Sequence, residues 1–108
     1  MIELIRSVEE LAREEHTRAN KEHDEYFNSG NEALGVILEE IEEASDEAVD
    51  AAKAFDKFKQ AVYADDIEWQ SDSASDIYSA AVRAAAEFIQ VAAMAKKAIA
   101  SNKEVEHE

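Results

Sequence analysis

The stretch 36-VILEEIEEASDEAVD-50 combines many carboxylates with apolar residues at helical spacing. A helix face rich in acids can serve solubility alone. Acids beside a buried seam can instead hold a divalent cation, because Mg²⁺ prefers oxygen ligands and carboxylates in particular. Such an ion neutralises a bound phosphate and aligns an attacking water, for which a spare carboxylate is the general base. The stretch therefore has two explanations, a solvated face and a metal site.

Glu87 is the only acid among residues 77–100, in a segment that is otherwise largely apolar. Burying a lone carboxylate is costly, so this side chain needs a proton, a cation or a hydrogen-bonding partner. One explanation is an ion pair with Arg83, one helical turn earlier. The other is a divalent cation that Glu87 shares with the glutamates of the acidic stretch.

Helical periodicity predicts the elements that would position these acids. One helix is expected over about residues 2–26, a second from the polar break at 27–31 to about 63, and a third over about 76–101. Heptad seams run along the last two helices. The expected seam residues are Leu34, Ile37, Ile41, Ala44, Ala48, Ala51, Phe55, Phe58 and Val62, followed by Ile77, Ala81, Ala84, Phe88, Val91, Ala95 and Ala98.

These seams predict where the polar residues point. Glu40 and Glu43 occupy the g and c positions of the second helix, and Glu87 and Gln90 occupy the same positions of the third. In an antiparallel pair of helices like flanks face each other, g toward g. We therefore expect the four side chains to converge.

The start and the continuity of the second helix are less well specified. Either Ser29 or Asn31 can cap it. The helix is expected to run unbroken to about 63, or to break once near Ser45 or Asp50.

The stretch 65-DDIEWQSDSAS-75 is predicted to be a loop that ends in a helix cap, either Ser73 or Ser75. Trp69 and Ile67 are expected to anchor this loop on the core.

Composition favours an all-α fold, a small helical bundle of three to five helices. The chain has 108 residues, no proline, two glycines and no cysteine, which predicts one domain over 1–108 without disulfides or zinc–thiolate sites. We expect its polar tail, 101–108, to be frayed. The last helix is apolar nearly all round, which predicts a homo-oligomer, a dimer or a tetramer.

Charge and hydropathy exclude some partners. The net charge of −15 argues against nucleic acid binding through a basic patch. The chain lacks an apolar run of membrane-spanning length and a basic, apolar leader, so we expect no membrane partner and a cytoplasmic location.

Two segments resemble a known family. The run 39-EEIEE-43, within 32-EALGVILEEIEEASDE-47, fits the EExxE motif of the MazG-like, all-α nucleoside triphosphate pyrophosphohydrolases, and 87-EFIQVAAMAKKAI-99 resembles a later segment of phage-type and bacterial members. The resemblance covers roughly residues 15–50 and 80–100. It implies Mg²⁺, with Mn²⁺ as an alternative, and hydrolysis of a nucleoside triphosphate to the monophosphate and pyrophosphate.

The resemblance also implies site residues. Glu39, Glu40 and Glu43 match EExxE and would bind the metal, with Glu40 and Glu43 as the catalytic carboxylates. Glu87 matches the glutamate of the family's ExxD. Gln90 stands where the aspartate is expected, and its amide oxygen can still coordinate Mg²⁺.

The departure at position 90 leaves alternatives open. Glu47 or Asp50 can supply the missing carboxylate, and Lys53 and Arg83 are weaker candidates for binding the substrate phosphates. A protein of the same fold that binds nucleotide or metal without catalysis is the second hypothesis. An acidic helical interaction protein is the third.

Overall fold

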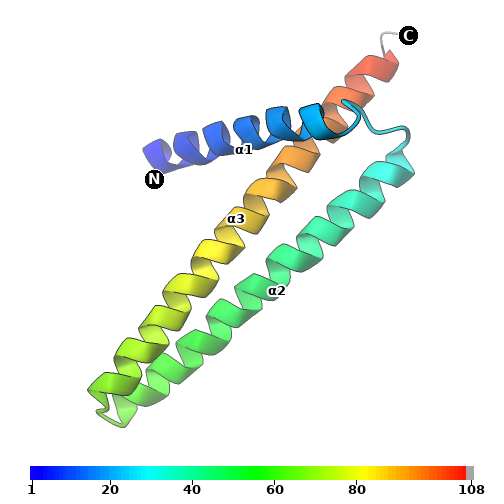
Figure 1. The fold of residues 1–108 in the computed structure, drawn as a ribbon. Coiled ribbons are helices and arrows are strands. Elements are labelled where there is room, and N and C mark those ends of the chain that lie inside the picture. The colour runs from blue at the N-terminus through cyan, green and yellow to red at the C-terminus, as the bar shows by residue number, and fades with distance from the viewer. Residues whose placement is uncertain (107–108) are drawn as a thin grey trace. The chain divides into compact units, whose positions relative to one another are not determined.

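The computed structural model describes residues 1–106, and its elements are three α-helices (Figure 1). They are α1 (Ile2–Glu22), α2 (Gly30–Tyr63) and α3 (Ile67–Glu106). The predicted all-α fold is confirmed for these residues. Within the same residues, no helix is both long enough and apolar enough to cross a membrane.

The chain divides into two compact units, and α2 and α3 each contribute to both. The first unit contains residues 1–41 and those from 87 onward, and the second contains residues 42–86. The expectation of one domain over 1–108 stays a prediction.

Helix α2 begins with a side-chain cap and runs without a break. The amide of Glu32 donates a hydrogen bond of 3.1 Å to Oγ of Ser29, so Ser29 is the cap among the two candidates. The helix continues through Ser45 and Asp50, which confirms the unbroken alternative.

The turn between α2 and α3 shows that the predicted loop over 65–75 is wrong. Asp65 has a φ of 54°, a left-handed conformation that aspartate tolerates better than most residues. Its amide bonds to the Val62 carbonyl, and the amide of Asp66 bonds to the Ala61 carbonyl. This pair of hydrogen bonds is a Schellman motif, which ends α2 without glycine.

The same turn starts α3 nine residues earlier than expected. Oδ1 of Asp66 accepts a 3.0 Å hydrogen bond from the Trp69 amide, so Asp66 is the cap in place of Ser73 or Ser75. Ser73 is buried inside the helix, and Ile67 is 69% exposed, so its predicted role as an anchor is also wrong. Trp69 is half-buried.

Two other helix ends differ from the sequence-based boundaries. Helix α1 ends at Glu22, because His23 is extended. Helix α3 continues past Ser101 to Glu106, over most of the tail for which fraying was expected; residues 107 and 108 lie outside the described part.

In the second unit, α2 and α3 pack antiparallel through small side chains at the d and g positions (Figure 1). The buried residues are Ala44, Ala54, Ala61, Ser73, Ala80 and Ala84. The predicted d positions are therefore confirmed, but the predicted a positions, such as Phe55 and Val62, are exposed. Alanine and serine at g let the two helix backbones approach more closely than bulky residues at a would. The helices therefore contact each other through d and g, one heptad position away from the predicted a and d.

In the first unit, α1 crosses α3 (Figure 1). The segment that connects α1 to α2 also contacts α3. Ala12 and Ala19 of α1 are buried. The amide of Phe27 donates a 2.8 Å hydrogen bond to Oγ of Ser101. The Lys97 ammonium lies 4.5 Å from the centroid of the Phe27 ring, a cation–π contact.

Candidate metal centre

Glu40 and Glu87 lie on the packed face of their helices. The packed seam between α2 and α3 uses the d and g positions. Glu40 and Glu87 are both at g, so they belong to this seam and do not lie beside it. Both side chains are half-buried, and Glu43, one turn after Glu40 on α2, is exposed. The g-toward-g arrangement expected from the sequence therefore brings a carboxylate of α2 to a carboxylate of α3.

Three carboxylates form a cluster that could hold a metal ion. Glu40, Glu43 and Glu87 each offer one oxygen, and these oxygens all lie within 4.8 Å of one another. Glu43 follows the boundary between the two units on the continuous helix α2. Three of the predicted ligands thus come together.

The cluster has the right chemistry for a hard divalent cation. Oxygens bound to one octahedral Mg²⁺ are about 3.0 Å apart when adjacent and about 4.2 Å apart when opposite, since each Mg–O bond is about 2.1 Å. The three glutamate oxygens, all within 4.8 Å of one another, would have to move closer together to bind one ion. Three carboxylates would fill half of an octahedral shell and leave the other positions for waters or phosphate oxygens.

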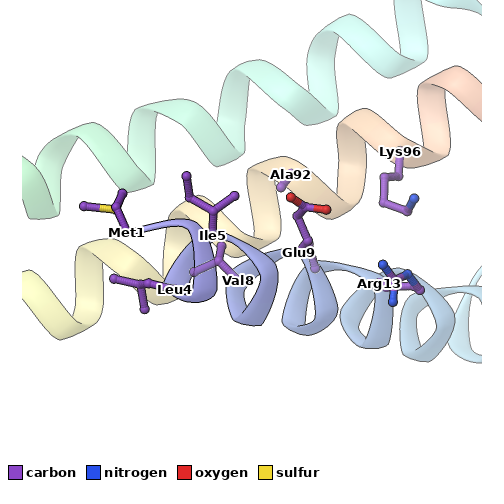
Figure 2. A pocket seen from close by; sticks show the side chains of 9 residues that line it. Met1, Leu4, Ile5, Val8, Glu9, Arg13, Ala92 and Lys96 are labelled. Atoms are coloured by element: carbon purple, nitrogen blue, oxygen red, sulfur yellow. The ribbon is translucent and has the colours of Figure 1, made fainter.

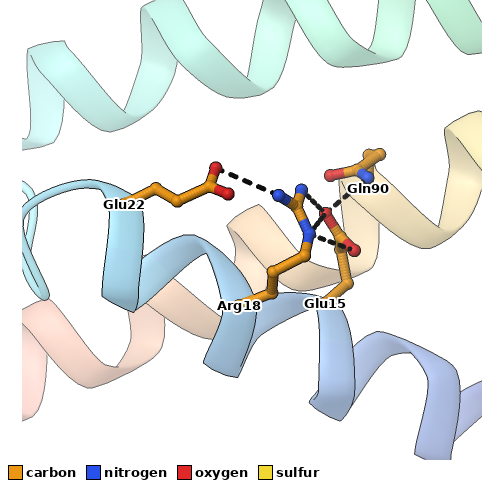
Figure 3. A network of polar contacts seen from close by, with 4 residues as sticks. All are labelled: Glu15, Arg18, Glu22 and Gln90. Atoms are coloured by element: carbon orange, nitrogen blue, oxygen red, sulfur yellow. Dashed lines mark hydrogen bonds and ion pairs between the residues drawn. The ribbon is translucent and has the colours of Figure 1, made fainter.

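Gln90 is held by α1 (Figure 3). Its Nε2 donates a 2.7 Å hydrogen bond to Oε1 of Glu15. Arg18 donates through Nε to the two oxygens of the same carboxylate, at 3.1 and 3.0 Å, and through Nη1 to Glu22 at 3.0 Å. The hydrogen bond from Arg18, followed by that from Gln90, lowers the pKa of the Glu15 carboxyl.

This network explains why an amide suits position 90. The amide nitrogen is directed at Glu15 and donates to its carboxylate (Figure 3). An aspartate at the same position would place a second carboxylate opposite Glu15, where like charges repel. Whether Oε1 of Gln90 binds a metal stays a prediction.

The remaining predicted site residues lie outside the cluster. Glu39 is exposed, on the side of α2 away from the seam. Arg83 donates through Nε to Glu47 at 2.9 Å and through Nη1 to Ser79 at 2.5 Å. The Arg83–Glu87 ion pair was one of the two explanations offered for Glu87, and in the structure Arg83 pairs with Glu47 instead. Lys53 is exposed.

The Arg83–Glu47 pair also bears on the missing carboxylate. Glu47 occupies the next g position after Glu40 and is half-buried, but its charge is already balanced by Arg83. Asp50 is exposed. Neither residue joins the cluster of three glutamates.

Sequence reasoning missed Glu15, which orients Gln90. The residue lies in a run of acidic and basic side chains on α1, and nothing in that run distinguishes it from Glu14 or Glu22. Its role depends on how α1 crosses α3, and no local pattern specifies that crossing.

Comparison of the chain with protein-family models, with curated proteins and with solved structures gave no match.

Proposed function

We propose that the protein is a Mg²⁺-dependent nucleoside triphosphate pyrophosphohydrolase of MazG-like type. The observation that carries the proposal is the cluster of Glu40, Glu43 and Glu87, with one oxygen of each within 4.8 Å of the others. The motif resemblance adds the reaction, hydrolysis of a nucleoside triphosphate to a monophosphate and pyrophosphate.

In the proposed reaction, a water oxygen attacks the α-phosphorus of the triphosphate, and the bond to the oxygen that bridges to the β-phosphorus breaks. A cluster carboxylate that is not needed as a ligand, Glu40 or Glu43, accepts the proton of the water. Bound Mg²⁺ would neutralise the phosphates and stabilise the leaving pyrophosphate. The half-buried positions of Glu40 and Glu87 would restrict water around these groups, which strengthens their electrostatic interactions.

Basic groups contribute less to the proposed substrate site. Arg83 is engaged with Glu47, so binding a phosphate would require it to leave that carboxylate. Lys53 lies exposed on α2 and is not held by an ion pair in the described residues. Most of the phosphate charge would therefore be balanced by metal.

A protein that binds metal or nucleotide without catalysis is the second candidate. The hydrogen bond between Gln90 and Glu15 favours it, because the position of the family's aspartate carries no charge and its amide nitrogen is already used. An acidic interaction protein is the third candidate, and only the net charge of −15 favours it.

Pyrophosphate release from a panel of ribo- and deoxynucleoside triphosphates tests the proposal. With Mg²⁺ we expect release from at least one of them, and loss of release in Glu40→Gln. Glu42→Gln is the matched control, since Glu42 is an exposed acid on the same helix and outside the cluster. Mg²⁺ binding without release from any triphosphate would favour the second candidate.

The variant Glu39→Gln tests whether the ligands are those implied by the EExxE motif or those that cluster in the structure. The family resemblance makes Glu39 a ligand, whereas its side chain is exposed and outside the cluster. Activity equal to that of Glu42→Gln would restrict the site to the three clustered glutamates. Activity as low as that of Glu40→Gln would show that the site includes all three acids of the motif.

We also propose that the protein is a cytoplasmic homo-oligomer. Large apolar side chains are exposed on all three helices, among them Leu34, Phe55 and Phe88. Association between copies would cover such side chains.

A further inference from the structure

A groove in the first unit lies between the first half of α1 and α3 (Figure 2). Its volume is about 510 Å³, which is within the range of sites that bind small molecules. Met1, Leu4, Ile5 and Val8 line it from α1, and Ala92 lines it from α3. Most of the wall is therefore apolar, and an occupant must bring apolar surface to it.

The groove has an apolar end and a basic end. Met1 and Leu4 lie at one end, and Arg13 and Lys96 lie at the other (Figure 2). Arg13 follows Met1 by twelve positions, which is about 18 Å along an α-helix that rises 1.5 Å per residue. The shape and the charges suit an elongated molecule with an apolar tail and an anionic head.

The basic end retains positive charge that an anion can use. Lys96 is exposed and forms no ion pair within residues 1–106. Arg13 pairs with Glu10, but both side chains are 56% exposed, and such a surface pair is weak. Glu9 also lines the groove, so two cations and one acid give the lining side chains a net charge of +1. The chain as a whole carries −15, so the groove differs in sign from the rest of the protein.

Two lysines of α3 also act on α1 beside the groove. Burial lowers the pKa of His16 most, and the charges of Lys96 and Lys97 lower it further, although Glu25 raises it. Lys97 is buried, and its ammonium lies 4.5 Å from the centroid of the Phe27 ring. Positive charge on α3 is therefore felt by α1 at the point where the two helices cross.

We propose that the groove binds a free fatty carboxylate. Its alkyl chain would lie along Leu4, Ile5 and Val8, and its carboxylate would bind Arg13 and Lys96. Each methylene that leaves water for such a lining strengthens binding by up to about fourfold. The proposal does not depend on the metal centre, because no residue of the groove belongs to the acidic cluster.

Isothermal titration calorimetry of the full chain with sodium decanoate, far below its micelle concentration, tests the proposal. We expect one decanoate per chain, with a dissociation constant between about 0.1 and 1 mM for a ligand of about twelve heavy atoms. Octanoate, which is shorter by two methylenes, should bind roughly tenfold more weakly. 1-Decanol has the same chain length without the charge and should bind about fivefold more weakly, the factor expected for one ion pair in water.

Nuclear magnetic resonance locates the bound ligand. In ¹H–¹⁵N correlation spectra, decanoate should shift the amide signals of residues 4–13 and 92–97. The signals of residues 44–84, which belong to the second unit, should not change.

Two pairs of variants test the charges. Lys96→Gln should weaken decanoate binding about fivefold, whereas Lys103→Gln, at an exposed lysine of α3 outside the lining, should not change it. Glu9→Gln should tighten binding at least about twofold by removing the opposing charge. Glu3→Gln, at an exposed acid of α1 outside the lining, should not. A gain of affinity in Glu9→Gln cannot come from loss of the fold.

A third pair tests the apolar wall. Val8→Glu should weaken decanoate binding at least about tenfold, because it places a charge in the path of the alkyl chain. Ser7→Glu adds the same charge to the same exposed half of α1 but outside the lining, and it should have little effect. Circular dichroism should show that both variants stay helical.

Three outcomes would overturn the proposal. The first is no binding of decanoate at 5 mM, including in a chain that binds anionic phospholipid vesicles or forms a dimer through α1, since another occupant would then hold the groove. The second is equal affinity for decanoate and 1-decanol, which would show that the basic end does not bind the head. The third is an equal effect of Glu9→Gln and Glu3→Gln, or of Val8→Glu and Ser7→Glu, which would place the bound decanoate elsewhere.

Discussion

Replacing Glu87 with glutamine removes one of three carboxylates whose oxygens lie within 4.8 Å of one another, at nearly constant side-chain size. Two unit charges 4.8 Å apart in water repel by about 0.9 kcal/mol, so the two contacts with Glu40 and Glu43 amount to about 2 kcal/mol at low salt. Screening at physiological salt, with a Debye length of about 8 Å, reduces this to about 1 kcal/mol. Without Mg²⁺, Glu87→Gln should therefore be more stable than the wild type.

With Mg²⁺ the wild type should gain more stability than Glu87→Gln, which narrows the difference between them. An ion that binds only the folded state at ten times its dissociation constant stabilises it by about 1.4 kcal/mol. With an unfolding entropy of about 2.1 cal/mol/K per residue, each 1 kcal/mol added to the free energy of unfolding raises the melting temperature of this chain by about 4 °C. Mg²⁺ should therefore raise the wild-type melting temperature by about 6 °C. Glu87→Gln should lose most of that gain.

Differential scanning calorimetry measures both effects, with EDTA or with 10 mM Mg²⁺, in 10 and in 150 mM NaCl. Glu42→Gln provides the same change of charge at an exposed site on α2 and should respond to Mg²⁺ as the wild type does. Lower stability of Glu87→Gln than of the wild type in EDTA would contradict repulsion within the cluster. A gain with Mg²⁺ equal to that of Glu42→Gln would contradict an ion shared by Glu87.

Three further predictions concern the fold and its pH dependence. Asp66→Ala should cost about 1 kcal/mol in urea unfolding, because it removes the cap of α3, whereas Ser75→Ala should not destabilise the helix. The Glu15 carboxyl, whose pKa is lowered by the hydrogen bond from Arg18, stabilises the fold above its unfolded pKa. This contribution is lost as the pH falls through the lowered folded pKa, so Glu15→Gln should flatten the loss of stability in acid. Burial lowers the pKa of His16, so the unfolded chain takes up its proton first; stability should fall as the pH drops below about 6.5, and His16→Gln should remove this part of the decline.

The acidic cluster was predictable from the sequence because it depends on two repeating patterns. Heptad positions place Glu40 and Glu87 on equivalent positions of two antiparallel helices, and Glu43 follows one turn later. Which heptad positions form the contact between α2 and α3 was harder to predict, since bulky residues at a and small residues at g are both compatible with a helix pair. In the structure the contact uses g, where Ala54, Ala61 and Ala80 are buried.

Other features depend on single residues or on contacts between distant segments. The polar composition of 65–75 indicates a loop, but one aspartate ends α2 and the next caps α3, so the turn needs no more residues. The bond between Gln90 and Glu15 joins residues 75 positions apart. Such a contact follows from the crossing of α1 and α3, which the periodicity of either helix does not determine.

Binding of Mn²⁺, followed by electron paramagnetic resonance, tests the metal centre most directly, because free Mn²⁺ gives a signal that is lost on binding. We predict stoichiometric binding to the wild type and to Glu42→Gln, competition by Mg²⁺, and at least a tenfold weaker affinity in Glu40→Gln and in Glu87→Gln. Equal affinity in all four proteins would contradict the assignment, because it would show that the ion binds to the acidic surface in general and not to the three clustered carboxylates.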